Sequence, residues 1–357
     1  MKITFVLPCA RLEGGIRVVA IYADLLRKRG HEVFVISWPA KPLRRRENLK
    51  LAIFKNDKNL KEVSHFDLYP YVPHKILESR RPVIDVDVPD ADVVIATWWE
   101  TAEWVAALSP QKGRKFYFIQ GYEVFDFLHK DRVEATYQLP LHKITISGWL
   151  LDLMKKKYDD TDVSLVFNSV DTNQFWAPSR TKNLQATIGF LYSSPHGKGC
   201  DLIFRVIEVV TKLIPELKVI AFGSHYPDSE LPLPSGVEFY HQPAQEKIRE
   251  IYAQCDVWLC ASRTEGFHLP PLEAMACRCP VVSTVVGGPA DIIKDGVNGY
   301  LVPQEDVNGL ASKLLDVLAL SNDEWQKMGG EAYKTATQYT WSDATDLFEK
   351  ACGYNEI

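Results

Sequence analysis

Two glutamates offer the clearest chemistry in this sequence. Glu265 and Glu273 lie eight positions apart in the segment ASRTEGFHLPPLEAMA, and the residues between them include a glycine, two prolines and a histidine. Carboxylates are strong hydrogen-bond acceptors, so such a pair can bind a ligand that carries several hydroxyl groups. The alternative is structural: Glu265 caps a helix, and Glu273 lies on its solvated face.

The elements around this pair would place it at the edge of a sheet. Residues 257–261 have the composition of a buried strand, GFHLPP argues against regular structure, and LEAMA favours the first turns of a helix. In open parallel sheets, ligands bind where a strand ends and a helix begins, because free N–H groups and the positive end of the helix dipole face that edge. Glu265 would lie at the mouth of this crevice, and Glu273 in the first helical turn.

Further motifs follow the pair in the C-terminal half. They are the glycines Gly287 and Gly288, an acid at Asp291, and the run Asp295-Gly296-x-Asn298-Gly299. Together with the glutamates, they resemble the retaining glycosyltransferases of family four, which carry an E-x7-E motif and have a GT-B fold. FYFIQGYEVF is similar to a stretch of rhamnosyltransferase-like members, which suggests polysaccharide biosynthesis. The resemblance implies an α/β fold of two Rossmann-like, doubly wound domains that face each other across a cleft.

Bulk properties favour a cytoplasmic enzyme. A chain of 357 residues predicts two domains, and a net charge of -5 gives no reason to expect nucleic acid as a partner. Seven scattered cysteines indicate reduced thiols, and Cys277 and Cys279 lack a second ligand pair at zinc spacing. No apolar stretch is long enough to span a bilayer, and the first residues read as a strand rather than a signal peptide.

Short apolar strands alternate with helical patterns in both halves of the chain, which predicts two mostly parallel sheets. Periodicity is lost around the segment NQFWAPSRTKNLQ. We therefore expect an N-terminal domain over 1–172, a linker over 173–185, and a C-terminal domain over 186–338. The resemblance implies that the first is the acceptor-side domain and that the second binds the nucleotide sugar. It also implies that a last helix, within 339–357, packs back on the N-terminal domain.

The resemblance also implies a donor site in the C-terminal domain. Lys198, before Gly199, matches the family's lysine, which stabilises the leaving diphosphate. Glu273 would bind the ribose, and Glu265 the sugar together with the backbone of Phe267, His268 and Leu269. Lys198 and Glu265 would thus be the catalytic residues. The structural alternatives are a lysine that caps a loop and a hydrogen-bonded histidine without contact to the ligand.

Three positions bear on how much positive charge would lie beside the diphosphate. Family members usually carry an arginine six residues before the lysine, where this chain has Tyr192. Arg17 and Arg263 are possible replacement cations, although a solvent-facing Arg17 is an equal alternative. If the missing charge limits activity, Tyr192→Arg should preserve or raise it.

Glycines at the N-terminal side complete the expected donor site. Gly14 and Gly15 lie between the first strand and the first helix, where their lack of a Cβ would let the backbone approach the diphosphate. Paired glycines at such a position are also common in ordinary turns.

On the acceptor side, the resemblance points to Gln120, Tyr122 and Glu123 at the carboxyl end of a strand. Trp98 and Trp99 follow another strand and offer aromatic faces for sugar rings. The alternative is that the two tryptophans belong to the core.

We expect no metal. Asp85 and Asp87 are spaced as in the metal-binding D-x-D motif of another glycosyltransferase fold, but they precede a strand and so lie at the wrong edge of the sheet. A solvated turn explains them better. A basic run of Lys41, Arg44, Arg45, Arg46 and Lys50 predicts a solvated loop, or weak peripheral contact with the inner face of a membrane.

The sequence thus predicts a metal-independent retaining glycosyltransferase. It would move a hexose from a nucleoside-diphosphate sugar, with UDP favoured, to a carbohydrate or lipid-linked acceptor. Two alternatives stay open: a nucleotide-sugar epimerase of the same fold, and an inactive subunit that binds a sugar nucleotide.

Overall fold

The structure, a computed structural model, describes residues 1–39 and 64–354. These residues form two compact units. The N-terminal unit comprises Met1–Thr145, Leu151–Val166 and Thr345–Ile357, and the C-terminal unit comprises Ile146–Leu150 and Phe167–Ala344. The chain therefore passes between the units four times. Two of these crossings are only five residues apart, on either side of Ile146–Leu150.

The N-terminal unit is built on a parallel sheet of seven strands in the order β3-β2-β1-β4-β5-β6-β7. The strands are β1 (Lys2–Cys9), β2 (Glu32–Trp38), β3 (His74–Ile76), β4 (Val93–Ala96), β5 (Arg114–Ile119), β6 (His142–Thr145) and β7 (Val163–Leu165). Helices cover both faces of such a sheet, so its inner strands are largely buried; all four residues of β4 are buried and apolar. The strand order reverses between β1 and β4, which places a ligand crevice at their carboxyl ends.

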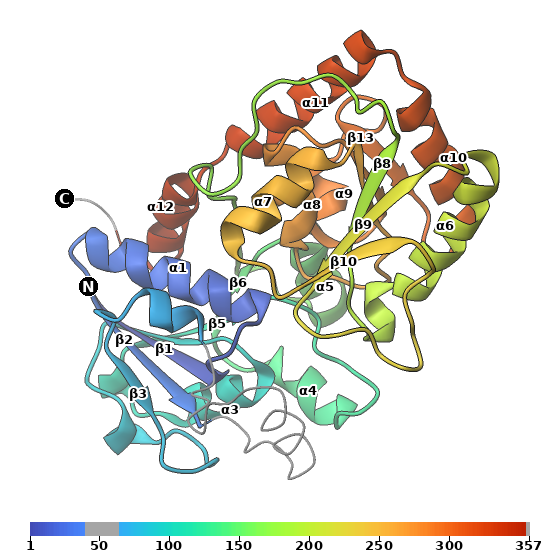
Figure 1. Ribbon diagram of the computed structural model, residues 1–357. Coiled ribbons are helices and arrows are strands. Elements are labelled where there is room, and N and C mark those ends of the chain that lie inside the picture. Colours follow the sequence, from blue (N-terminus) through green and yellow to red (C-terminus); the bar gives the residue numbers. More distant parts are fainter. Residues whose placement is uncertain (40–63, 355–357) are drawn as a thin grey trace, which may run out of the picture. The chain divides into compact units, whose positions relative to one another are not determined.

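Helices of this unit follow the strands in alternation (Figure 1). They are α1 (Gly14–Lys28), α3 (Trp99–Ala107), α4 (Lys130–Thr136) and α5 (Gly148–Tyr158), with short 3-10 turns η1 (His65–Leu68), η2 (Asp85–Asp87) and η3 (Pro110–Lys112). Only the first three residues of α5 belong to the C-terminal unit.

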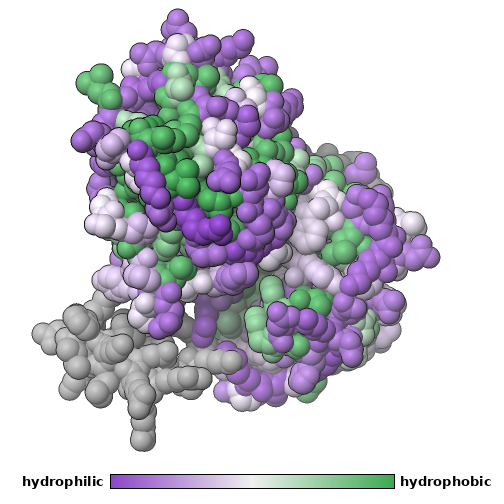
Figure 2. All heavy atoms as spheres, turned by 90° about the vertical axis from the view of Figure 1, so that its right-hand side faces the viewer, coloured by the Kyte–Doolittle hydropathy of each residue, from purple (hydrophilic) through white to green (hydrophobic). Residues whose placement is uncertain are grey.

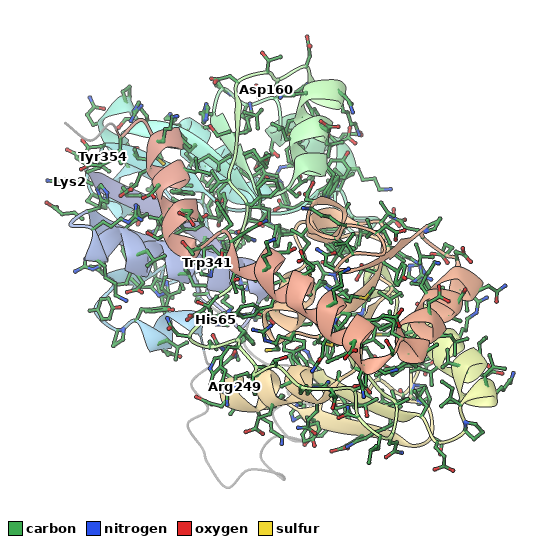
Figure 3. All side chains as sticks on the ribbon, turned by 90° about the horizontal axis from the view of Figure 1, so that it is seen from above. Lys2, His65, Asp160, Arg249, Trp341 and Tyr354 are labelled. Atoms are coloured by element: carbon green, nitrogen blue, oxygen red, sulfur yellow. The ribbon has the colours of Figure 1, made fainter. Side chains whose placement is uncertain are left out.

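The end of the chain also packs in the N-terminal unit. Helix α12 (Trp341–Ala351) enters this unit at Thr345, and Phe348 stacks on Phe5 and Tyr22 in its core. Glu349 is buried and accepts a 2.6 Å hydrogen bond from His31. Figure 3 shows Tyr354 on the same side of this unit as Lys2. Helix α12 thus contributes side chains to the core of the N-terminal unit.

The C-terminal unit contains a second parallel sheet, with the strand order β10-β9-β8-β11-β12-β13. Its strands are β8 (Thr187–Leu191), β9 (Lys218–Gly223), β10 (Val237–His241), β11 (Val257–Cys260), β12 (Val281–Thr284) and β13 (Gly299–Val302). The order runs outward from β8 in one direction and from β11 in the other. These two adjacent strands therefore form the point where the topology reverses, and where parallel sheets of this kind bind ligands.

Helices pack on both faces of this sheet. They are α6 (Cys200–Leu213), α7 (Gln245–Gln254), α8 (Leu269–Ala276), α9 (Gly287–Ile292), α10 (Val307–Ala319) and α11 (Asn322–Thr337), with the 3-10 turn η4 (His196–Lys198) before α6. The amphipathic α6 and α10 bury Val206, Leu310 and Leu314 in one core with the strands. Figure 2 shows one face of the molecule, where patches of apolar side chains interrupt a largely hydrophilic surface. Among the described helices, none has the length and apolar character needed to cross a membrane.

The segment predicted as a linker, 173–185, lies within the C-terminal unit, whereas the chain changes units between Val166 and Phe167. It contains no helix or strand. Its Phe175 is fully buried, and Arg180 donates hydrogen bonds to the carbonyl groups of Ala253 and Cys255. The loss of periodicity therefore marks an extended segment that is packed on the second unit.

Candidate functional site

The reversal point of the C-terminal sheet brings the two predicted catalytic residues together. Lys198 follows β8 and Glu265 follows β11, and the Lys198 Nζ lies 2.9 Å from each carboxylate oxygen of Glu265. Ser262 donates a third hydrogen bond to this carboxylate, at 2.8 Å. Burial by itself would raise the pKa of Glu265, but the charges and hydrogen bonds around it hold that pKa below its ordinary value. The site therefore holds an ionised carboxylate beside an ammonium group.

His268 lies next to this ion pair in a strained conformation. Its φ is 72°, in the left-handed region that favours glycine, and its Nε2 lies 3.7 Å from a Glu265 oxygen. Burial lowers the pKa of His268 to about 4, so the imidazole is neutral near pH 7. Its buried Nδ1 has no hydrogen-bond partner within the described ranges, and the residue lines a small cavity together with Ser193, Lys198 and Ser262. The imidazole can therefore accept or donate one further hydrogen bond.

The backbone after Glu265 is fixed from two sides. The indole Nε1 of Trp149 donates to the carbonyl oxygen of Gly266 at 3.0 Å. The N–H of Gly288 donates to the carbonyl oxygen of Phe267 at 2.7 Å. A Cβ on Gly288 would lie 2.4 Å from the Phe267 oxygen, which explains the glycine. Trp149 was missed from the sequence, since its position after a strand in the first half gives no sign of this contact.

Glu273 lies deeper, on α8. Its residue is 5% exposed, and its carboxylate accepts a 2.9 Å hydrogen bond from the Tyr252 hydroxyl. The helix begins at Leu269, so the expectation that the whole of GFHLPP is irregular is wrong for its last three residues. Pro270 and Pro271 occupy the first turn, where a proline loses no intrahelical hydrogen bond. Glu273 consequently lies in the second turn and not in the first.

Tyr192 belongs to the core. It is 3% exposed, its ring packs between Phe204 and Phe239, and its hydroxyl donates to the carbonyl of Leu231 and accepts from the N–H of Asp228. These two hydrogen bonds stabilise the loop between β9 and β10. An arginine here would bury an unpaired charge, which argues against the expectation that Tyr192→Arg preserves activity.

Arg263 is occupied elsewhere. Its guanidinium bonds both oxygens of Asp201, at 2.8 and 2.7 Å, and also the Glu305 carboxylate and the His196 carbonyl. This network raises the pKa of Arg263 above its ordinary value, chiefly through the hydrogen bonds that the guanidinium donates to Asp201. The structure therefore argues against Arg263 as the replacement cation. Arg17 lies in the first turn of α1 in the other unit, where its charge adds to burial in lowering the pKa of His65 to about 4.

The N-terminal unit places its glycines at the equivalent edge of its own sheet. Gly14 and Gly15 open α1 directly after β1 and its short loop. A Cβ on Gly15 would lie 3.3 Å from the amide nitrogen of Gln120, so Gln120 packs against the start of the helix. The buried Oε1 of Gln120 has no partner in the described part of the chain.

The other predicted acceptor residues divide into two groups. Trp98 and Tyr122 are half-buried, whereas Glu123 and Trp99 are each 4% exposed and belong to the core. Glu123 accepts hydrogen bonds from the Trp99 N–H at 2.8 Å and the Tyr117 hydroxyl at 3.1 Å. Burial raises the pKa of Glu123 to about 8. The structural alternative thus holds for Trp99, and Glu123 does not offer its carboxylate to a ligand.

With this geometry, the chain can be compared with known proteins. Residues 174–335 match the family model of the glycosyl transferases group 1. This match spans the Lys198–Glu265 pair, Glu273 and the Gly287–Gly288 turn. The similarity to this family therefore covers the C-terminal unit and less than half of the chain.

Curated relatives are similar in the same part. An uncharacterized glycosyltransferase of Methanocaldococcus jannaschii is 30% identical over 149 residues, which are 40% of this chain and 41% of that protein. A D-inositol 3-phosphate glycosyltransferase of Stackebrandtia nassauensis is 29% identical over 165 residues, 42% of this chain and 37% of that protein. The chain thus matches well under half the length of these relatives.

A solved structure is similar over nearly the whole chain. Anabaena HepE in complex with UDP superposes with a TM-score of 0.77, covering 99% of this chain and 100% of HepE, at 15% identity. At this identity the likeness concerns the fold alone, and it confirms the predicted class of two Rossmann-like domains.

Other features that the sequence singled out have structural partners or lie in segments without a described structure. Asp87 is bonded by Arg81 and Lys75, and Asp85 accepts from the Ser109 N–H, so both are held in the η2 turn. Cys277 and Cys279 are buried free thiols. The basic run, Lys41, Arg44, Arg45, Arg46 and Lys50, lies outside the described residues. In the ranges that are described, no cluster of three or more His, Cys, Asp or Glu is arranged to hold a metal.

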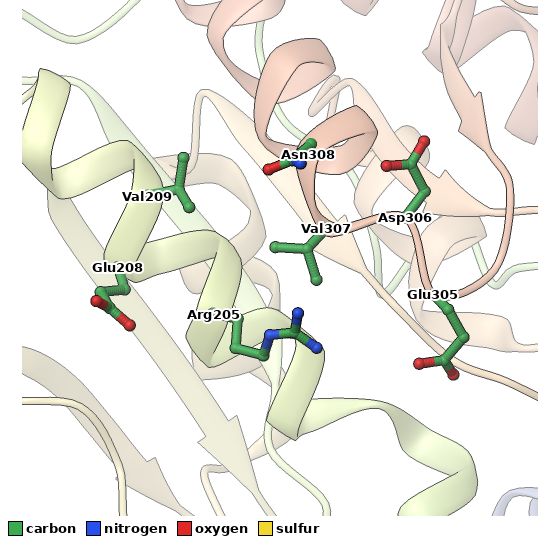
Figure 4. A pocket seen from close by; sticks show the side chains of 7 residues that line it. All are labelled: Arg205, Glu208, Val209, Glu305, Asp306, Val307 and Asn308. Atoms are coloured by element: carbon green, nitrogen blue, oxygen red, sulfur yellow. The ribbon is translucent and has the colours of Figure 1, made fainter.

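A polar cavity of about 290 Å³ lies between α6 and the start of α10 (Figure 4). Its lining consists of Arg205, Glu208, Val209, Glu305, Asp306, Val307 and Asn308. Its lining includes three carboxylates and one arginine, and Glu305 is already held by Arg263. None of the predicted site residues lines this cavity.

Proposed function

We propose that this protein is a retaining glycosyltransferase that transfers a hexose from a nucleoside-diphosphate sugar to a carbohydrate or lipid-linked acceptor. The observation that carries the proposal is the Lys198–Glu265 pair at the reversal point of the C-terminal sheet. An ammonium group and a carboxylate at this position match the two ends of a sugar diphosphate, one anionic and the other rich in hydroxyl groups.

In the proposed complex, Lys198 binds the diphosphate and Glu265 accepts hydrogen bonds from the sugar. The two side chains are paired in this structure, so the diphosphate would compete with Glu265 for the ammonium group. Glu273, buried on α8 beside Tyr252, would bind the ribose hydroxyls. The N–H groups of Phe267 and His268 would supply further donors to the phosphate.

The chemical step would follow from these contacts. The bond between the anomeric carbon and the diphosphate oxygen breaks, and the acceptor oxygen bonds to the same face of the sugar. The acceptor proton passes to the departing diphosphate, whose charge Lys198 stabilises. We propose that this step needs no metal ion, and that the N-terminal unit contributes Gly14, Gly15 and the acceptor site around Gln120, Tyr122 and Trp98.

UDP is the favoured nucleotide. HepE, which has a similar fold, is described in complex with UDP, and with UDP-glucose. We further propose a cytoplasmic protein that uses its basic run for weak contact with anionic membranes.

Two other functions are compatible with the same pair. A nucleotide-sugar epimerase would use the donor site alone, and an inactive subunit would bind the nucleotide without turnover. The pairing of Lys198 with the buried Glu265 carboxylate favours a catalytic site over the inactive subunit, because nucleotide binding alone does not require a buried carboxylate at the sugar position.

A thermal-shift screen of UDP-, GDP-, ADP- and dTDP-sugars tests the donor class. A ligand present at one hundred times its dissociation constant stabilises the protein by about 2.7 kcal/mol, which is readily measured. We expect a UDP-sugar to give the largest shift, and the shift to be lost in Glu273→Ala. No shift with any nucleotide sugar would contradict the proposal.

A further inference from the structure

Trp149 makes a direct contact with the backbone of the loop that joins Glu265 to α8, residues 266–268. It lies in the first turn of α5, within Ile146–Leu150 of the C-terminal unit. Its indole Nε1 donates to the carbonyl oxygen of Gly266 at 3.0 Å. Gly266 directly follows Glu265, so this hydrogen bond acts on the peptide group adjacent to the proposed catalytic carboxylate.

The backbone that carries Trp149 is itself anchored in the same unit. The N–H of Gly148 donates to the Asp291 carboxylate on α9 at 2.9 Å. A Cβ at Gly148 would lie 2.7 Å from the other oxygen of Asp291, so the close approach requires glycine. Gly148 and Trp149 therefore act together: the first fixes the start of α5, and the second extends from it to the loop.

Because a peptide group is planar, the hydrogen bond from Trp149 to the Gly266 carbonyl also fixes the direction of the Phe267 N–H. The Gly266 carbonyl and the Phe267 N–H belong to one planar trans peptide and point in opposite directions. The next peptide is held in the same way, because the Phe267 carbonyl accepts from Gly288 at 2.7 Å. Neither the Phe267 nor the His268 N–H has a hydrogen-bond partner recorded among residues 1–39 and 64–354. The direction of both N–H groups is thus set by the carbonyl group of the same peptide, and their capacity to donate a hydrogen bond is unused within this part of the chain.

We infer that Trp149 is a positioning residue of the active site, which holds the Gly266–Phe267 peptide so that its N–H faces the anionic part of the substrate. The inference rests on the proposed function. Hydrogen-bond donors that are held in place before the reaction stabilise charge that develops in the transition state more than charge already present in the bound substrate. Loss of the indole N–H should accordingly reduce kcat more than it reduces the affinity for the nucleotide sugar.

The test compares two tryptophan variants. Trp149→Phe keeps a ring but loses the N–H, and should lower kcat about 10-fold or more while KM for the donor sugar changes less than about 3-fold. The matched control is Trp325→Phe. Trp325 also donates its indole N–H to a carbonyl, that of Asp256 at 2.8 Å, but at the amino end of β11 and away from the loop. The control should lose stability and keep its kcat.

A second readout needs no substrate. Amide exchange at Gly288 reports the hydrogen bond to Phe267, and should be at least about 5-fold faster in Trp149→Phe and unchanged in Trp325→Phe. Unchanged kcat in Trp149→Phe, or a loss of kcat matched by Trp325→Phe, would overturn the inference. If the wild type transfers no sugar, the proposed function fails, and unchanged exchange at Gly288 would then refute the positioning contact separately.

Discussion

Replacing Lys198 with alanine would test the charge that the account places at the leaving group. The side chain is 37% exposed, and it pairs with both oxygens of Glu265, whose side chain is 7% exposed. Removal of one preorganised charge that stabilises a leaving group costs about 10²-fold or more in turnover, or about 3 kcal/mol. We expect a fall of this size in kcat for Lys198→Ala.

The structure changes the expected effect on stability. From sequence, a lysine in an open crevice should be dispensable for folding, but its loss leaves the buried Glu265 carboxylate without a counter-ion. Breaking a fully buried pair costs about 3–5 kcal/mol; because Lys198 is partly solvated and Ser262 still donates to Glu265, we expect about 1–2 kcal/mol. That corresponds to a fall of about 2–8 °C in the melting temperature of a unit of this size.

A double variant separates the two effects. Lys198→Ala combined with Glu265→Gln removes the buried charge, so the melting temperature should recover towards that of the wild type while turnover stays low. Chemical denaturation and steady-state kinetics on the same preparations measure both quantities. Turnover within a factor of about 3 of the wild type in Lys198→Ala would refute the charge assignment, and Arg17 would become the principal cation.

Further predictions concern three buried side chains. Glu273→Ala should weaken binding of the nucleoside diphosphate by about 1.5–3 kcal/mol in calorimetry, and unchanged affinity would remove Glu273 from the site. Tyr192→Arg should cost about 3–5 kcal/mol of stability, because it buries an unpaired charge. Tyr192→Phe should cost about 1–3 kcal/mol, because the lost hydroxyl has two hydrogen-bond partners. An arginine variant as stable as the wild type would contradict the placement of Tyr192 in the core. Glu123 has a pKa raised to about 8, so the folded state binds its proton more tightly than the unfolded state, and stability should fall as pH rises from about 4.5 to 8. Glu123→Gln should flatten that fall in denaturation curves measured across this range, and an unaltered slope would argue against a protonated Glu123.

Sequence patterns were informative wherever the chemistry is local. The alternation of strand and helix patterns predicted two parallel sheets, and Glu265 and Lys198 predicted a site at the carboxyl ends of β8 and β11. Strand type follows from composition, and parallel topology then determines which edge a loop occupies. These inferences need no knowledge of distant contacts.

Tertiary contacts decided what sequence could not. Arg263 forms ion pairs with Asp201 and Glu305, which lie 62 and 42 positions away. The positions of charged residues along the sequence do not reveal these pairs. Glu123 and Tyr192 were expected at functional edges, but their burial depends on partners from other elements. Trp149 contacts Gly266 over 117 positions, and nothing in its local sequence marks the contact.

Product analysis of a single reaction tests the central claim most directly. The protein, a nucleotide sugar chosen by the thermal-shift screen, a panel of carbohydrate and lipid-linked acceptors and EDTA would be incubated together, and products followed by NMR. The account predicts that nucleoside diphosphate is released only when an acceptor is present, and that the new glycosidic bond keeps the anomeric configuration of the donor. An isomerised nucleotide sugar, an inverted linkage or turnover that requires added Mg²⁺ or Mn²⁺ would contradict it.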